Sequence, residues 1–197
     1  MPQSPGSTRQ QTAAALIAAL LAVSSILVVP IGPVPVTLQV FVVILAGLLL
    51  SPAWAGTSIV VYLLLGAAGV PVFAGATGGL GVIGGPLGGY LIGFAAGAMI
   101  GAAVRQSLER RGVPSVLSDT ACTAVTVVVI YFAGVTQLWA VSRLGADGLT
   151  FVQAILAGAA PFILFDAGKA VVAILVAQAL RRTGVLPSAK DAARAMP

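Results

Sequence analysis

Two ionisable residues lie inside the last apolar segment of the chain, within PFILFDAGKAVVAILVAQAL at 161–180, ahead of the terminal Arg181 and Arg182. Asp166 and Lys169 are three positions apart, so on a helix they share one face and can form an ion pair. Lys169 precedes Arg181 by about 18 Å of helix, too far for its ammonium to reach the charged boundary. Ionisable residues at such depth are costly and usually functional. The pair is either a lock between helices or a polar floor for a solute, and the scarcity of other charges in the apolar segments favours the floor.

A glycine-rich stretch could form the other side of such a site. Residues 69–94, GVPVFAGATGGLGVIGGPLGGYLIGF, hold ten of the 24 glycines. The first part has no continuous helical pattern, so Gly75 and Gly78 would present bare backbone amides in a loop, while Phe73 and Tyr90 would offer aromatic faces. We therefore expect these four residues to contribute to ligand binding.

The same stretch contains a glycine repeat with a different expected role. Glycines recur every fourth residue and would give one helix a stripe without side chains, a spacing typical of closely packed membrane helices: Gly81, Gly85, Gly89, Gly93, Gly97 and Gly101. From Gly93 onward we interpret this stripe as packing. Gly79, Gly81 and Gly84 also match a dinucleotide fingerprint, but the strand, the βαβ context and the following acid are missing.

Composition identifies the class of protein. The chain has 197 residues, of which 59% are hydrophobic and 8% are charged, with a mean hydropathy of +1.09. Soluble domains carry about 25% charged residues, so this chain is predicted to be an all-α integral membrane protein in the lipid bilayer. It has no histidine, and Cys122 is its only cysteine. We therefore expect no disulfide, no metal and no cofactor.

Six apolar segments are separated by glycine, proline or charge, and each is predicted to cross the membrane: 12–29, 36–51, 53–68, 83–104, 119–140 and 154–180. The predicted organisation is an N-terminal tail at 1–11, a six-helix transmembrane domain at 12–182 and a C-terminal tail at 183–197.

The basic residues predict the orientation. Eight of them fall in segments that six crossings place on the side of the N-terminus: Arg9, Arg105, Arg110, Arg111, Arg181, Arg182, Lys190 and Arg194. Only Arg143 falls on the other side. Because cytoplasmic segments are enriched in lysine and arginine, both termini are predicted to be cytoplasmic and 69–82 to be external. Topology thus accounts for the net charge of +5, and no nucleic-acid partner is expected.

Catalytic patterns are not found. Gly168-Lys169 is followed by Ala170, so no P-loop is formed. One carboxylate and one ammonium without histidine make a poor active site. We expect a protein that is not an enzyme.

Three motifs together resemble the BioY family, the biotin-binding S components of energy-coupling-factor (ECF) vitamin transporters. They are PVPVTLQ at 33–39, LGAAGVPVFAGATGGLGVIGGPLGGYLIGF at 65–94, and PF-x-x-x-D-x-x-K at 161–169. The resemblance covers roughly residues 12–182, and the middle motif is the most specific. The sequence departs from the family pattern at Leu87, where threonine is usual, and at Phe165, where glycine is expected.

The resemblance implies a six-helix S-component bundle in the inner cell membrane that captures biotin from outside. It also implies docking on a transmembrane coupling protein with a pair of ATP-binding subunits that hydrolyse ATP. Small residues of the first helix would dock there, either Ala14, Ala18 and Ala22 or Ala15 and Ala19, although alanines can also simply fill a lipid-facing helix.

Biotin's ureido ring and carboxylate suit the polar residues of the motifs, with Thr37 and Gln39 completing the set around Asp166 and Lys169. Which residue meets which end of biotin stays open at this point. Two alternatives also stay open: an S component for a different vitamin, and a membrane protein without a transport function.

Overall fold

The protein is described here by a computed structural model that covers residues 5–31, 34–145 and 148–183. Within these ranges the chain is mostly helical, and its elements follow in this order: α1 (Pro5–Ser24), β1 (Val28–Ile31), β2 (Val34–Thr37), α2 (Gln39–Leu49), α3 (Pro52–Ala67), α4 (Leu80–Gly84), α5 (Gly88–Arg110), α6 (Ser115–Ser142), α7 (Phe151–Gly158) and α8 (Ile163–Arg182). The expected C-terminal tail, with Lys190 and Arg194, lies outside the described residues except for Thr183.

The long helices α5 and α6 pack against each other along the glycine stripe. A Cβ atom added to Gly97 would lie 2.8 Å from the carbonyl oxygen of Thr126, and one added to Gly93 would lie 2.9 Å from Cα of Ile130. Side chains cannot be accommodated at such distances, so these glycines allow the two backbones to approach. The packing role is confirmed for α5. The stripe is not one continuous helix, however, because Gly81 belongs to α4 and Gly85 to the turn that follows it.

The first apolar segment differs from the prediction. Helix α1 begins at Pro5 and ends at Ser24, and residues up to Val29 do not continue it. Instead β1 and β2 form an antiparallel hairpin in which Val28 pairs with Thr37. Prolines in both strands remove amide donors, which is tolerated because a two-stranded hairpin has only edge strands. The expectation of an all-α chain is therefore wrong in this one element.

Helices α2 and α3 are short. With 11 and 16 residues they span about 16 and 24 Å, less than the ~30 Å of a hydrocarbon core. By length and composition, three of the described helices could cross a membrane, namely α5, α6 and α8. The α2–α3 turn must therefore find partners for its backbone groups inside the protein.

The last apolar segment is divided. Helix α7 starts with a capping box formed by Thr150 and Gln153 and ends at Gly158. Four residues, among them Pro161, separate it from the start of α8 at Ile163. Proline removes an amide donor and ends the helical pattern. The expected single span over 154–180 is thus two helices, and the break places Asp166 in the first turn of α8.

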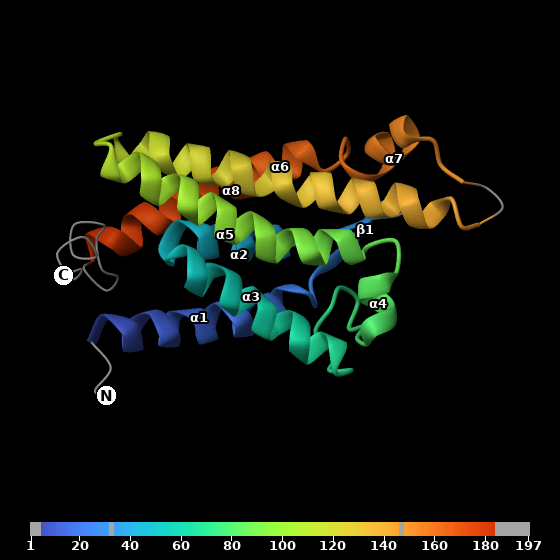
Figure 1. The fold of residues 1–197 in the computed structure, drawn as a ribbon, viewed down its shortest axis with the longest axis horizontal. Helices are drawn as coiled ribbons and strands as arrows, with labels where there is room; N and C mark the ends of the chain where they lie inside the picture. Colours follow the sequence, from blue (N-terminus) through green and yellow to red (C-terminus); the bar gives the residue numbers. More distant parts are fainter. Residues whose placement is uncertain (1–4, 32–33, 146–147, 184–197) are drawn as a thin grey trace.

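The elements group at two ends of the molecule (Figure 1). Helix α1 starts, and α8 ends, at the end where the α2–α3 turn and the α5–α6 turn also lie, while α4, α7 and the hairpin lie toward the other end. The termini of the helix bundle are therefore on the side opposite α4.

Candidate ligand-binding site

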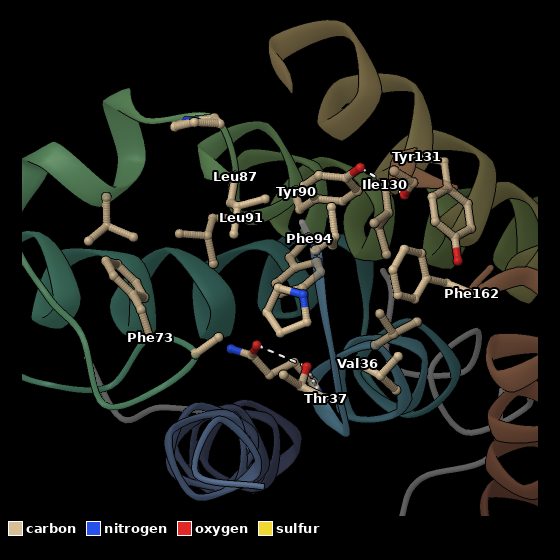
Figure 2. A pocket seen from close by; sticks show the side chains of 18 of the residues that line it. Val36, Thr37, Phe73, Leu87, Tyr90, Leu91, Phe94, Ile130, Tyr131 and Phe162 are labelled. Carbon is tan, nitrogen blue, oxygen red and sulfur yellow. Dashed lines mark hydrogen bonds between the residues drawn. The ribbon is translucent and has the colours of Figure 1, made fainter. Parts of the chain in front are cut away.

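A cavity of about 360 Å³ lies among β2, the start of α2, the glycine-rich segment, α5, α6 and α8. This volume falls in the range of small-molecule sites, roughly 300–1,000 Å³. Figure 2 shows Phe73 at one side of the cavity, Tyr131 and Phe162 at the other, and Thr37 across from Tyr90. The cavity is formed by segments far apart in the sequence, including all three motifs.

Six of the eight residues expected to bind a ligand line this cavity: Thr37, Gln39, Phe73, Tyr90, Asp166 and Lys169. The sequence therefore identified most of the polar and aromatic groups around one space. The remaining lining is largely apolar and includes Val36, Leu91, Phe94, Ile130 and Phe162.

Asp166 and Lys169 form the predicted ion pair. Nζ of Lys169 lies 2.7 Å from Oδ1 of Asp166, and the residue Asp166 is 4% exposed. The other carboxylate oxygen, Oδ2, accepts a hydrogen bond of 2.5 Å from the hydroxyl of Tyr131. The carboxylate is thus held from two sides, while the ammonium, which has three donors, has donors left for a ligand.

Tyr131 was missed in the sequence. It lies in α6 within the apolar run TVVVIYFAG. Neither its neighbours nor its spacing to other polar residues indicates a role in binding. Only the packing of α6 beside α8 brings its hydroxyl to Asp166, across 35 positions of the chain. Tyr131 also lines the cavity, so it belongs to the site.

Gln39 is the first residue of α2 and is held by two neighbours. Its Oε1 accepts a 3.0 Å hydrogen bond from the Thr37 hydroxyl, and its Nε2 donates to the hydroxyl of Tyr62 at 2.5 Å. Tyr62, fully buried in α3, donates in turn to the carbonyl oxygen of Val72 at 3.0 Å. This chain of bonds ties the start of α2 to the glycine-rich segment, and the sequence indicated no such role for Tyr62.

The two aromatic residues that were expected at the site are each held in place by contacts with other segments, and a glycine takes part in each case. Phe73 packs edge-on against Tyr62 with ring centroids 5.5 Å apart, and its ring occupies the space that a side chain at Gly66 would need. Tyr90 donates to the carbonyl oxygen of Gly158 at 2.8 Å. Because both rings are held in place, the cavity wall they form is preorganised.

Gly75 and Gly78 are not among the lining residues. Gly75 has a positive φ of 72°, which the turn of the backbone at this point requires. A Cβ added to Gly78 would lie 2.5 Å from the carbonyl oxygen of Val70, so no side chain fits there. Their positions are explained by the fold of the loop. A direct role in binding stays a prediction without a contact that supports it.

One side of the cavity is formed by α4 and the turn after it, including Gly81, Gly85 and Leu87. Gln137 of α6 holds this turn, since its Nε2 donates to the carbonyl oxygens of Ile83 and Gly85, both at 2.8 Å. Leu87, one of the two departures from the family pattern, contributes apolar surface here. Phe165, the other departure, is half exposed.

The alanines of α1 divide into two sets. Ala14 and Ala18 are buried and Ala22 is half-buried, whereas Ala15 and Ala19 are exposed. The first set packs against the body of the protein, so it is not available to a partner. Of the two docking sets considered from the sequence, only Ala15 and Ala19 lie on an open face.

Comparison with known proteins gives a consistent result. Residues 1–185 match the family described as BioY family. A probable biotin transporter BioY of Pyrococcus horikoshii is 41% identical over 85% of this chain and 93% of the relative, and the biotin transporter BioY of Thermotoga maritima is 37% identical over 90% and 98%. The crystal structure of an S-component for biotin from an ECF-type ABC transporter superposes with a TM-score of 0.82, at 24% identity over 92% of this chain and 95% of that one. At 24% identity, the match to this crystal structure shows that the two chains share a fold.

Proposed function

This chain belongs to the BioY family, and on that premise we propose that it is the substrate-binding membrane subunit of a biotin uptake transporter. The cavity carries the proposal, because it brings the three family motifs and the buried Asp166–Lys169 pair around one space of suitable size. Its apolar walls suit the thioether ring and alkyl tail of biotin, and its few polar groups suit the ends.

The charge balance of the pair favours one orientation of biotin. Asp166 and Lys169 together carry no net charge, so a carboxylate placed between them would leave one buried negative charge uncompensated. The ureido group is neutral and has two N–H donors and one carbonyl acceptor, to which a carboxylate and an ammonium are complementary. In this proposal the ureido group meets the pair, and the carboxylate of biotin lies away from it.

Titration of the purified full-length chain with radiolabelled biotin tests the function. We expect saturable binding of one biotin per chain that excess unlabelled biotin abolishes and excess thiamine or riboflavin does not. Competition by another vitamin instead of biotin would favour an S component for that vitamin. No saturable binding of any of them at micromolar concentration would contradict a capture function.

We further propose six crossings of the cell membrane with both termini in the cytoplasm, and a cavity that opens outward. The start of α1 and the end of α8 lie at one end of the molecule (Figure 1), and exposed Arg110, Arg111 and Arg182 lie at that end. In this proposal the short helices α2 and α3 are two of the six crossings. The backbone groups of the turn between them are satisfied by polar contacts inside the protein.

Single cysteines test this topology in a Cys122→Ala background. Thr77→Cys in the glycine-rich segment is expected to react with an impermeant thiol reagent added outside intact cells. Thr183→Cys at the end of α8 is expected to react only after the membrane is permeabilised. Thr77 and Thr183 are both exposed in the structure, so a thiol at either position is open to the reagent on its side of the membrane. The reverse labelling pattern would overturn the proposed orientation.

A transporter subunit that lacks a P-loop needs an energy source, so we propose that the chain docks on a transmembrane coupling protein with a pair of ATP-binding subunits. The open face of α1 around Ala15 and Ala19 suits this docking, because small side chains let another membrane helix approach closely.

A further inference from the structure

Two arginines meet at the end of α2 that is remote from the cavity. From the sequence, Arg105 and Arg181 were expected to lie at the membrane boundary as topology signals. In the structure Arg105 is inside α5 and only 9% exposed, and Arg181 is half-buried near the end of α8. Boundary position alone does not require such burial, so the contacts of the two side chains need a separate explanation.

Arg105 bridges α5 and α2. Its Nε donates to the carbonyl oxygen of Gly47 and its Nη2 to that of Leu50, both at 3.2 Å. Its Nη1 lies 3.0 and 3.1 Å from the carboxylate oxygens of Glu109. The guanidinium thus makes contacts with two backbone carbonyls and one carboxylate at the same time.

Arg181 makes the equivalent contacts from α8. Its two terminal nitrogens bind both oxygens of Asp119 at 2.8 and 2.9 Å, and Nη2 also donates to the carbonyl oxygen of Leu48 at 2.6 Å. Asp119 is fully buried in α6. Only the planar fork of arginine combines a bidentate carboxylate contact with a carbonyl contact in this way.

These contacts complete the C-terminus of α2. The last carbonyl groups of a helix have no partner within it and form the negative end of its dipole. Here the carbonyl oxygens of Gly47, Leu48 and Leu50 accept hydrogen bonds from the two arginines. Leu48 and Leu50 are fully buried, so water is not available to take the place of these donors. We call the four charged residues the arginine clasp: Arg105, Glu109, Asp119 and Arg181.

Three of the helices that meet in the clasp also carry polar groups of the cavity. Helix α2 begins with Gln39, α8 carries Asp166 and Lys169, and α6 carries Tyr131. From Asp166 to Arg181 the distance along α8 is about 22 Å. Because close-packed protein interiors transmit strain, a shift of a helix in the clasp is expected to displace its polar groups in the cavity.

We infer that Arg105 and Arg181 are positioning residues for the ligand site: by holding the end of α2 against α5, α6 and α8, they set the spacing between Gln39 and the Asp166–Lys169–Tyr131 group. This inference rests on the proposed biotin-binding function. It assigns to charges at the opposite end of the molecule an influence on ligand affinity that acts through the positions of the helices, beyond stability and topology.

Arg105→Lys and Arg181→Lys test it, because each keeps the positive charge but lacks the planar fork that makes these simultaneous contacts. The measurement is a biotin titration that reports both the dissociation constant and the number of sites per chain, well below the melting temperature. A positioning role changes the dissociation constant at a stoichiometry near one. A purely structural role lowers the number of competent molecules and leaves the dissociation constant unchanged.

We expect each lysine variant to raise the dissociation constant at least fivefold with stoichiometry preserved. Leu21→Ala is the control, since Leu21 is fully buried in α1, outside both the clasp and the cavity. It is expected to lower the melting temperature and to keep the dissociation constant within twofold of the wild type. Asp119→Asn, which retains both arginines, is measured alongside and is expected to weaken binding to a smaller extent, so that the question is answered even if a lysine variant does not fold.

The outcomes separate the two proposals. A wild-type chain that does not bind biotin contradicts the proposed function itself. If the wild type binds and the folded clasp variants have its dissociation constant, the arginines serve only stability and the inference is overturned while the function stands.

Discussion

Lys169→Met is expected to lower biotin affinity at least tenfold, a loss of about 1.4 kcal/mol or more in binding free energy. The substitution removes the ammonium that lines the cavity and leaves Asp166 with the Tyr131 hydroxyl as its remaining side-chain partner among the described contacts. Breaking one side of a buried pair typically costs about 3–5 kcal/mol, so stability is expected to fall as well. The measurements are a thermal unfolding curve and a biotin titration of the same preparation.

The double variant Asp166→Asn with Lys169→Met separates binding from stability. It removes both charges at once, and the asparagine oxygen can still accept from Tyr131. We expect much of the stability lost in the single variant to return while affinity stays at least tenfold below the wild type. A double variant with undiminished affinity would show that the pair serves packing alone.

The methyl ester of biotin identifies the group that meets the pair. It keeps the ureido ring and has no negative charge on the tail. If the ureido group lies at the pair, Lys169→Met weakens the ester and biotin by the same factor. A loss confined to biotin would place the carboxylate at Lys169 instead.

Ala19→Trp is expected to abolish co-purification with the coupling protein while biotin capture is retained. Ala19 lies on the open face of α1, one turn from Ala15, and an indole there would hold the partner helix away from the α1 backbone. Co-purification from cells that express the complete transporter measures docking, and biotin binding of the isolated chain measures capture.

Two variants of the same helix serve as controls for docking. Ala18→Trp places the same bulk at a buried position and is expected to lower the melting temperature through overpacking. Leu20→Trp adds an indole at an exposed position that already carries a large side chain, and it is expected to dock normally. Wild-type docking by Ala19→Trp would exclude this face of α1 as the contact.

Some contacts within a helix could be predicted because they depend only on helical periodicity. The spacing of Asp166 and Lys169 placed both groups on one face, and the structure shows their ion pair. The glycine spacing from Gly93 onward predicted close packing, and α6 lies against it. The rise and turn of one helix determine which of its residues share a face, so the local sequence contains the pairing and the small-residue face, but not which helix packs on that face.

The faces of α1 could not be distinguished in this way. AAALIAALLA is apolar on all sides, so the pattern does not show which alanines meet the protein and which remain open. Packing against α2 and α3 decided it, and those helices are other segments of the chain.

By itself the sequence determined that the chain is rich in apolar segments, that Asp166 and Lys169 pair, and that its motifs are those of one family. The tertiary structure alone decided that Tyr131 completes the charged pair, that Tyr62 holds Gln39, and that Arg105 and Arg181 close the end of α2. The physical reason is the distance along the chain over which each kind of interaction acts. Periodicity and composition act within a segment, whereas these hydrogen bonds join groups from different helices, whose meeting depends on how every helix packs against the others.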